Sequence, residues 1–231
     1  MTPGFPSCRV VVTVLACAGT ALTSIGALGQ TPSAPACRTY SAEEVRTLSG
    51  RGSGTINQTC RFDSATFERT CTIRSRTNAG SFTLDLTDKY ASVADFVDEI
   101  RVIPPIARIQ RQTRRFVSGP AANADVTYEY DGARRQTRIS TAMKGNLIVM
   151  TYNGWDAMGR PTGGVSSSRA STVTLKYDYG DAARTMTITG PAGVEVDTYN
   201  ADGNMIQETS TDGGGKTEYA IKITKTETVC R

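Results

Sequence analysis

Histidine is absent from this chain of 231 residues, which restricts its chemistry from the outset. Histidine is the commonest general base at neutral pH and a usual ligand of zinc and iron. Without it, serine and cysteine nucleophiles cannot be activated by the familiar histidine-dependent systems. We therefore expect no catalytic residue and no cofactor, and we interpret the chain as non-enzymatic.

The densest group of carboxylates could in principle hydrolyse glycosides, which needs two carboxyl groups held across a substrate. The group consists of Asp85, Asp88, Asp95, Asp98 and Glu99. The last three fall on one side of a short expected helix, and we interpret that side as a solvated face. Calcium could be attracted by these carboxylates or by Asp197, Asn200 and Asp202, but the chain has no Asp-x-Asp-x-Asp-Gly loop. No metal site is expected.

The segment Gly214-Gly215-Lys216-Thr217 imitates the end of a phosphate-binding loop. The complete pattern requires an earlier glycine, where this chain has Ser210, and a helix that follows the loop. The residues from Glu218 to Glu227 alternate like a strand instead. We expect a hairpin turn at these glycines.

A group of arginines gives the middle of the chain a basic character, although the whole chain has a net charge of only +4. Binding of single-stranded nucleic acid would call for aromatic residues among them, and only Phe116 is near. We interpret the arginines as a solvated strand face, with an anionic envelope or glycan surface as the alternative. They are Arg101, Arg108, Arg111, Arg114, Arg115, Arg134, Arg135 and Arg138.

The first 29 residues have the pattern of a signal peptide. An arginine precedes the uncharged apolar stretch from Val10 to Leu28, and Ala27-Leu28-Gly29 supplies small residues for cleavage. We expect the mature chain to begin at Gln30, to be flexible up to residue 36, and to be periplasmic or extracellular. In the alternative, Cys17 ends a lipobox and is lipidated. The mature sequence contains no apolar run of membrane-spanning length.

Cleavage would leave four cysteines, an even number that suits an oxidising compartment. They are Cys37, Cys60, Cys71 and Cys230, and their spacing matches no zinc site. Strands expected over Thr55 to Phe62 and Phe67 to Arg74 would set Cys60 opposite Cys71. Cys37 and Cys230 would then tie the mature ends together, although the sequence alone leaves the other pairings open.

Strand-forming residues dominate the chain, because its 33 threonines stand among Val, Ile and Tyr. We expect a predominantly all-β fold of consecutive antiparallel hairpins in a twisted or curling sheet, with two lobes over residues 37–119 and 125–231. Phe82, Leu84 and Leu86 should share one face of a strand, and the strand that closes the chain should contain Ile221, Ile223 and Val229.

Two short helices are expected in the first lobe. One should begin at the capping box Ser41-Ala42-Glu43-Glu44 and end near Gly50. The other should follow Ser92 and stop before Pro104. Its residues Val93, Phe96, Val97 and Ile100 recur at helical spacing and would pack on a sheet.

The second lobe repeats a tyrosine followed by Asp or Asn. The pairs are Tyr130-Asp131, Tyr152-Asn153, Tyr177-Asp178 and Tyr199-Asn200. We expect each tyrosine to end a strand and to bury its ring against a neighbouring hairpin, while Asp or Asn bonds local backbone. A glycine then accepts the left-handed turn geometry.

Two longer segments resemble units of the YD-repeat, or Rhs-repeat, family. They run from Tyr152 to Thr162, with Gly159 and Arg160, and from Tyr199 to Ile206, with Gly203. The resemblance covers about residues 125–210, where two other units are degenerate. It implies consecutive hairpins in a long twisted or curling sheet, which closes around a toxin in large members of the family. Four or five units are too few for such a shell.

This resemblance and the missing histidines lead to two functional hypotheses. The first is a non-catalytic binding or structural module of the cell envelope or extracellular space, whose partner is an envelope, glycan or protein surface. The second is a ligand carrier, or an enzyme independent of histidine, in which the curled sheet surrounds a cavity lined by Asp and Arg.

Overall fold

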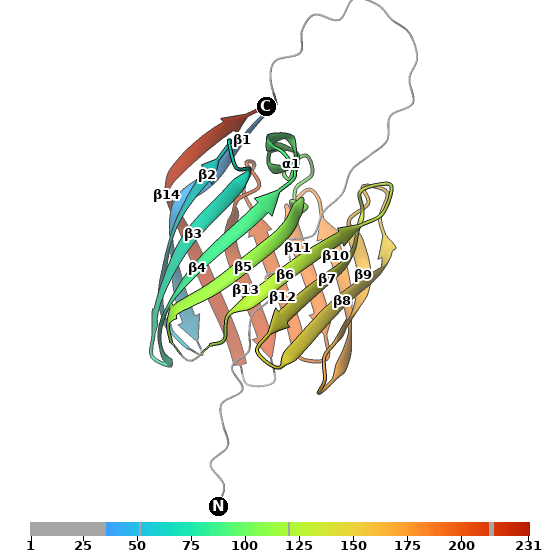
Figure 1. Cartoon of the computed structure of the whole chain (residues 1–231). Helices are drawn as coiled ribbons and strands as arrows, with labels where there is room; N and C mark the ends of the chain where they lie inside the picture. Colours follow the sequence, from blue (N-terminus) through green and yellow to red (C-terminus); the bar gives the residue numbers. More distant parts are fainter. Residues whose placement is uncertain (1–35, 51, 120, 213–214) are drawn as a thin grey trace, which may run out of the picture.

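The computed structural model describes residues 36–50, 52–119, 121–212 and 215–231. The expected signal peptide, Gln30 and Cys17 lie outside these residues. As expected, the described chain is predominantly strand, and each strand is antiparallel to the next (Figure 1). The strands are β1 (Cys37–Gly50), β2 (Gly54–Asp63), β3 (Glu68–Thr77), β4 (Gly80–Tyr90), β5 (Ile109–Ser118), β6 (Ala124–Tyr130), β7 (Gln136–Met143), β8 (Asn146–Trp155), β9 (Pro161–Ser167), β10 (Thr172–Gly180), β11 (Thr185–Gly190), β12 (Gly193–Tyr199), β13 (Met205–Asp212) and β14 (Gly215–Cys230).

The sheet closes into a barrel, because β1 pairs with β14 from Cys37 opposite Cys230 to Gly50 opposite Thr217. The expectation of a curling sheet is wrong in this respect. Closure pairs the backbone groups that two edge strands would leave open. Strands from both expected lobes contribute to this one wall, since β5 also pairs with β6.

The single helix of the described residues, α1 (Val93–Asp98), lies at one end of the barrel, between β4 and β5 (Figure 1). Ser92 caps it as expected and accepts a hydrogen bond from the backbone nitrogen of Asp95. Phe96 is fully buried and packs against three rings of the barrel wall, those of Tyr40, Phe62 and Tyr90. We call residues 91–108 the plug, because this connection fills that end of the barrel.

The helix expected after Ser41 does not form, because Cys37–Gly50 is strand β1. The Ser41 hydroxyl donates to the Glu44 carboxylate at 3.0 Å, but the Ser41 backbone nitrogen donates to Asn204, so the side-chain-to-backbone bonds of a capping box are replaced. These contacts lie beside a bulge in the pairing with β14. Two flanking strands offer β1 long ladders of backbone hydrogen bonds, which outweigh a local helix preference.

Side chains alternate between the interior of the barrel and its outer face. Phe82, Leu84 and Leu86 point to the same side, as expected, and that side is the interior, since buried Cys71 lies opposite Leu86. Two groups of buried apolar residues occupy the interior. One surrounds the plug, and the other joins β6, β7, β8, β10, β11 and β12 through Val126, Ile139, Met150, Tyr152, Tyr177, Met186 and Tyr199.

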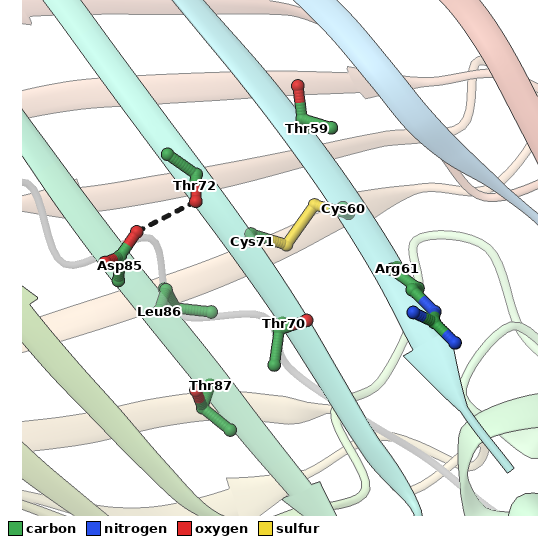
Figure 2. A pocket seen from close by; sticks show the side chains of 9 residues that line it. All are labelled: Thr59, Cys60, Arg61, Thr70, Cys71, Thr72, Asp85, Leu86 and Thr87. Carbon is green, nitrogen blue, oxygen red and sulfur yellow. Dashed lines mark hydrogen bonds between the residues drawn. A yellow bond between two sulfur atoms is a disulfide. The ribbon is translucent and has the colours of Figure 1, made fainter.

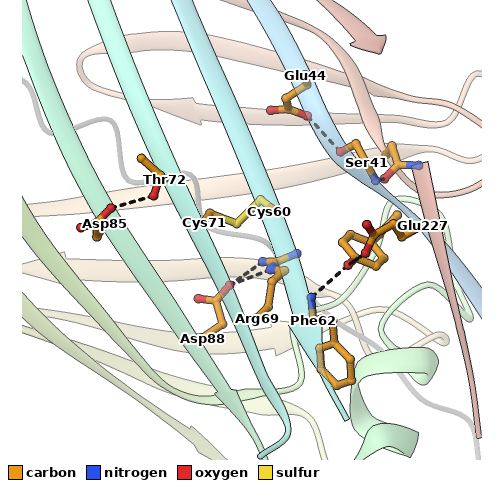
Figure 3. The surroundings of a disulfide bond; sticks show 12 residues. Ser41, Glu44, Cys60, Phe62, Arg69, Cys71, Thr72, Asp85, Asp88 and Glu227 are labelled. Carbon is orange, nitrogen blue, oxygen red and sulfur yellow. Dashed lines mark hydrogen bonds and ion pairs between the residues drawn. A yellow bond between two sulfur atoms is a disulfide. The ribbon is translucent and has the colours of Figure 1, made fainter. Parts of the chain in front are cut away.

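Both disulfides are present as anticipated. Cys60 and Cys71 are directly opposite each other on β2 and β3 and are joined, and Cys37 is joined to Cys230 across the seam that closes the barrel. Figure 3 shows the first bridge beside the ion pair of Arg69 and Asp88. These bridges indicate an oxidising compartment outside the cytoplasm.

Four hairpin turns at the plug end share one geometry. Each begins with Asp131, Asp156, Asp181 or Asn200, whose carbonyl oxygen accepts a hydrogen bond from the backbone nitrogen three residues later. The donor residue has a positive φ in every case: 61° at Arg134, 73° at Gly159, 53° at Arg184 and 75° at Gly203. Glycine therefore occupies only two of the four left-handed positions.

The repeat expected from the sequence is partly out of register with these turns. Tyr130 and Tyr199 immediately precede their turns, but Tyr152 and Tyr177 lie inside β8 and β10, four residues before theirs. Asn153 and Asp178 are consequently exposed strand residues that begin no turn. The expected burial is confirmed for Tyr152, Tyr177 and Tyr199, whose exposures are 3%, 2% and 3%.

Consecutive turns are also linked to each other and to the plug. Arg160 is buried, bonds Asp156 within its own turn and Asp181 in the next, and stacks on Tyr179 at 4.1 Å. Gly203 packs so closely on the plug that an added Cβ atom would lie 2.7 Å from Ile100. The turns thus form a rim that holds the plug.

Candidate ligand-binding site in the barrel interior

The acidic residues singled out in the sequence do not form one site. Asp85 points outward and accepts a hydrogen bond from Thr72, whereas Asp88 points inward to Arg69 and Gln112. Asp95, Asp98 and Glu99 are all buried, so the expected solvated helix face is wrong. Because α1 covers a barrel end, its carboxylates are enclosed by basic partners, which are Arg134, Arg231 and Arg38 in that order.

The arginines of the middle segment are also divided between environments. Arg111 and Arg115 lie on the outer face and pair with Asp125, as expected of a solvated strand face. Arg108 is instead buried and donates to the backbone oxygen of Arg134. Arg114 points inward and donates to Gln112 at 2.6 Å. A continuous basic surface is therefore not formed by these residues.

The calcium candidates of the second half are separated as well. Asp197 is buried inside the barrel, whereas Asn200 binds the backbone nitrogens of Asp202 and Asn204 within a turn. Among the described residues, no group of three or more potential ligands could hold a metal ion. Gly215, Lys216 and Thr217 begin strand β14, and Gly214 lies outside the described residues.

A hollow of about 420 Å³ lies over the Cys60–Cys71 disulfide (Figure 2). The side chains of Thr59, Thr70 and Thr87 have the outward register, as do Arg61 and the bonded pair of Thr72 and Asp85. Each is an ordinary outward residue of a threonine-rich strand, and no buried unpaired group is directed into the hollow. This surface offers little to distinguish one ligand from another.

A second pocket, of about 340 Å³, differs in its chemistry. It lies near the end of the barrel opposite the plug, where the Pro191-Ala192 turn joins β11 to β12. Val173, Leu175 and Ile188 form an apolar surface on β10 and β11, which we call the apolar wall, and Glu195 and Ser210 lie beside it on β12 and β13. These five residues have the inward register of the barrel.

Two further carboxylates lie behind Glu195. Asp197 follows it by two residues on β12 and therefore points to the same side, and Glu208 stands directly opposite Asp197 on β13. Asp197 is 1% exposed and Glu208 is 2% exposed. We call Glu195, Asp197 and Glu208 the acidic triad.

The pKa values of the triad are raised above their ordinary range. Burial is the main cause for all three groups. For Asp197 the neighbouring charges of Glu195 and Glu208 add to burial and bring its pKa to about 8. Burial and Glu208 bring the pKa of Glu195 to about 7, and the pKa of Glu208 is raised as well. The interior thus holds three acids that oppose each other's ionisation.

No arginine or lysine among the described residues forms an ion pair with the triad. Three arginines that point into the barrel form ion pairs with other acids: Arg46 with Glu44, Arg69 with Asp88, and Arg38 with Glu99. The hydroxyl of Tyr199 donates to Asp197 Oδ2 at 3.3 Å, but Asp197 Oδ1 and Glu208 Oε1 are buried without a hydrogen-bond partner. Such atoms are uncommon in folded proteins and call for an explanation.

Sequence reasoning missed Glu195 and Glu208 and placed Asp197 only among calcium candidates. The segment Gly193-Val194-Glu195-Val196-Asp197 alternates apolar and acidic residues, and this pattern predicts valines inside and carboxylates outside. The structure inverts that assignment, since Val194 is 39% exposed while Asp197 is buried. The two glutamates therefore carried no sequence signal that distinguishes them from solvated strand residues.

Comparisons with known proteins give no further guide to this site. No family model, curated protein or solved structure matches the chain. Among the described residues, no helix has the length and apolar composition needed to cross a membrane.

Proposed function

We propose that this protein is an exported, non-catalytic binding module whose barrel holds a small ligand with an apolar part. The observation that carries this proposal is the interior pocket, where Val173, Leu175 and Ile188 lie beside Glu195 and the rest of the acidic triad lies behind it. An apolar wall with a few convergent polar groups is the usual composition of a small-molecule site. The pocket favours the carrier hypothesis over a purely architectural role.

The cellular setting is part of the same proposal. The N-terminal pattern of an uncharged apolar stretch and a small-residue cleavage site supports export to the periplasm or the exterior. The resemblance to YD repeats is also retained as a proposal, and the four similar turns at the plug end are in keeping with it. The missing histidines support a binding role rather than catalysis.

Binding of the neutral fluorescent probe N-phenyl-1-naphthylamine tests the pocket directly. We expect its emission to rise with the mature protein and the rise to be lost in Gly190→Leu. A Cβ atom at Gly190 would lie 2.6 Å from the flexible end of Leu175, so the new side chain would fill the pocket. The matched control is Thr189→Leu, which adds similar bulk to the outer face of the same strand. Equal probe binding by both variants would rule out this pocket as the site.

A further inference from the structure

We infer that the acidic triad is the recognition site for an organic cation, an alkylammonium group whose apolar body lies against Val173, Leu175 and Ile188. This inference rests on the proposed function, because it assigns a chemical class to the ligand of that pocket. It is carried by two independent observations, the unpartnered buried oxygens of the triad and the apolar wall beside it.

The unpartnered oxygens of the triad indicate which chemical group a ligand would have to supply. Asp197 Oδ1 and Glu208 Oε1 are acceptors when ionised, so a group that completes them in that form donates hydrogen bonds. An ammonium group has three donors and a compact positive charge, and it can bond both carboxylates at once. A neutral donor would satisfy the hydrogen bonds but would bring no positive charge to offset the repulsion among the ionised forms of the three acids.

The charge arrangement around the triad points to the same ligand. The charge of Arg46 lowers the pKa values of Asp197 and Glu208, but in both cases burial raises the pKa by more. Arg46 is held by Glu44, with its Nε atom 2.8 Å from that carboxylate. The described residues therefore provide the triad with no ion-pair partner, so an incoming cation would meet carboxylates whose ionised form is only weakly supported by Arg46.

The depth of the acids relative to the pocket determines the shape of the ligand. Glu195 lines the pocket, whereas Asp197 and Glu208 lie farther along the same strands, toward the plug. A ligand that enters from the end opposite the plug must pass its cationic group over the apolar wall to reach them. A molecule with a cationic head and an apolar tail can contact the acids and the apolar wall together. A bare metal ion would leave the apolar wall without a contact.

A matched set of eight-carbon compounds tests this inference. Octylammonium, octanol and octanoate share one tail and differ only in their head groups, and their binding to the mature protein can be compared by isothermal titration calorimetry at pH 7.5. We expect octylammonium to bind at least about tenfold more tightly than octanol, with octanoate weakest, because charge-assisted hydrogen bonds are the stronger ones.

Two variants then test whether the triad causes the preference for octylammonium over octanol. Glu195→Gln combined with Glu208→Gln should lower the preference of octylammonium over octanol to about threefold or less while octanol binding persists. Glu218→Gln removes a carboxylate from the outer register of the neighbouring strand and should leave the preference unchanged. The double variant should also melt at a higher temperature than the parent, because it removes buried acids without ionic partners.

The outcomes distinguish the inference from the proposed function. Equal binding of octylammonium and octanol, or an unchanged preference in the double variant, would overturn the cationic ligand while leaving a neutral ligand in the pocket. Failure of every compound and of the naphthylamine probe to bind would overturn both. A lower melting temperature of the double variant would show that the triad serves the fold, and would also overturn the inference.

Discussion

Asp197 and Glu208 stand directly opposite each other on β12 and β13, and both carboxylates are buried inside the barrel. Opposite residues of an antiparallel pair bring their Cβ atoms to about 5 Å, so like charges at these positions repel. With Glu195 on the same face, this pair makes the interior sensitive to pH and gives the first prediction.

Stability should fall as pH rises from 5 to 9. Asp197 and Glu195 have folded-state pKa values of about 8 and about 7, against ordinary values of 3.8 and 4.5. Within this window the folded chain binds more protons than the unfolded chain, so raising the pH favours unfolding. Each group loses about 1.4 kcal/mol per pH unit up to its folded-state pKa, so we expect a combined loss on the order of 5 kcal/mol, measured by urea denaturation at each pH.

Asp197→Asn combined with Glu195→Gln should flatten this dependence, and Glu218→Gln should preserve it. An undiminished slope in the double variant would show that other groups are responsible. Surface carboxylates with lowered pKa values, such as Asp125 and Asp131, lose their contributions only at lower pH, so they do not affect this window.

Arg38→Met should destabilise the protein by about 3 kcal/mol. Arg38 extends from β1 to the plug, where it pairs with Glu99 and donates to the backbone oxygen of Phe96. Glu99 is 1% exposed, so removal of the arginine leaves its carboxylate buried among Tyr90 and the Arg108 backbone nitrogen. Adding Glu99→Gln should restore more than half of the loss in equilibrium denaturation. A double variant less stable than Arg38→Met would contradict this account.

The two disulfides should differ in their contributions to stability. Cys37 and Cys230 are 193 residues apart in the sequence, whereas Cys60 and Cys71 are 11 apart. Because a longer closed loop restricts the unfolded chain more, replacing Cys37 and Cys230 by serine should cost about 2 kcal/mol more than replacing the other pair. Guanidinium denaturation of both double variants measures the difference. The reverse order would indicate that packing around buried Cys60 outweighs chain entropy.

Arg184→Gly should stabilise the protein by about 0.5 kcal/mol, since Arg184 has a φ of 53° and glycine adopts this conformation without a side-chain clash. Gly159→Ala, at the equivalent position of the preceding β-hairpin turn, should destabilise it by about 1 kcal/mol. Thermal melting of the two variants gives the comparison. If both substitutions shift the melting temperature in the same direction, the shared turn geometry does not govern these positions.

Local patterns in the sequence were sufficient wherever the interacting residues are close along the chain. The Ser92 cap depends on Asp95, three residues away, and the Cys60–Cys71 bridge depends on one hairpin. The alternation of Phe82, Leu84 and Leu86 follows from the two-residue period of a strand. These features therefore predicted the helix start, a disulfide and the all-β class.

Contacts between distant residues decided what the sequence left open. The segment after Ser41 has a helix-start pattern, yet it became β1 because residues near 225 and near 57 pair with it on both sides. That same pairing with β14 closes the barrel and gives the sheet an inside. Closure determines which face of β12 lies inside the barrel, and it is the face of Glu195 and Asp197, while Val194 on the other face is exposed. Strand periodicity gives two opposite faces, but burial of one of them is determined by the complete sheet.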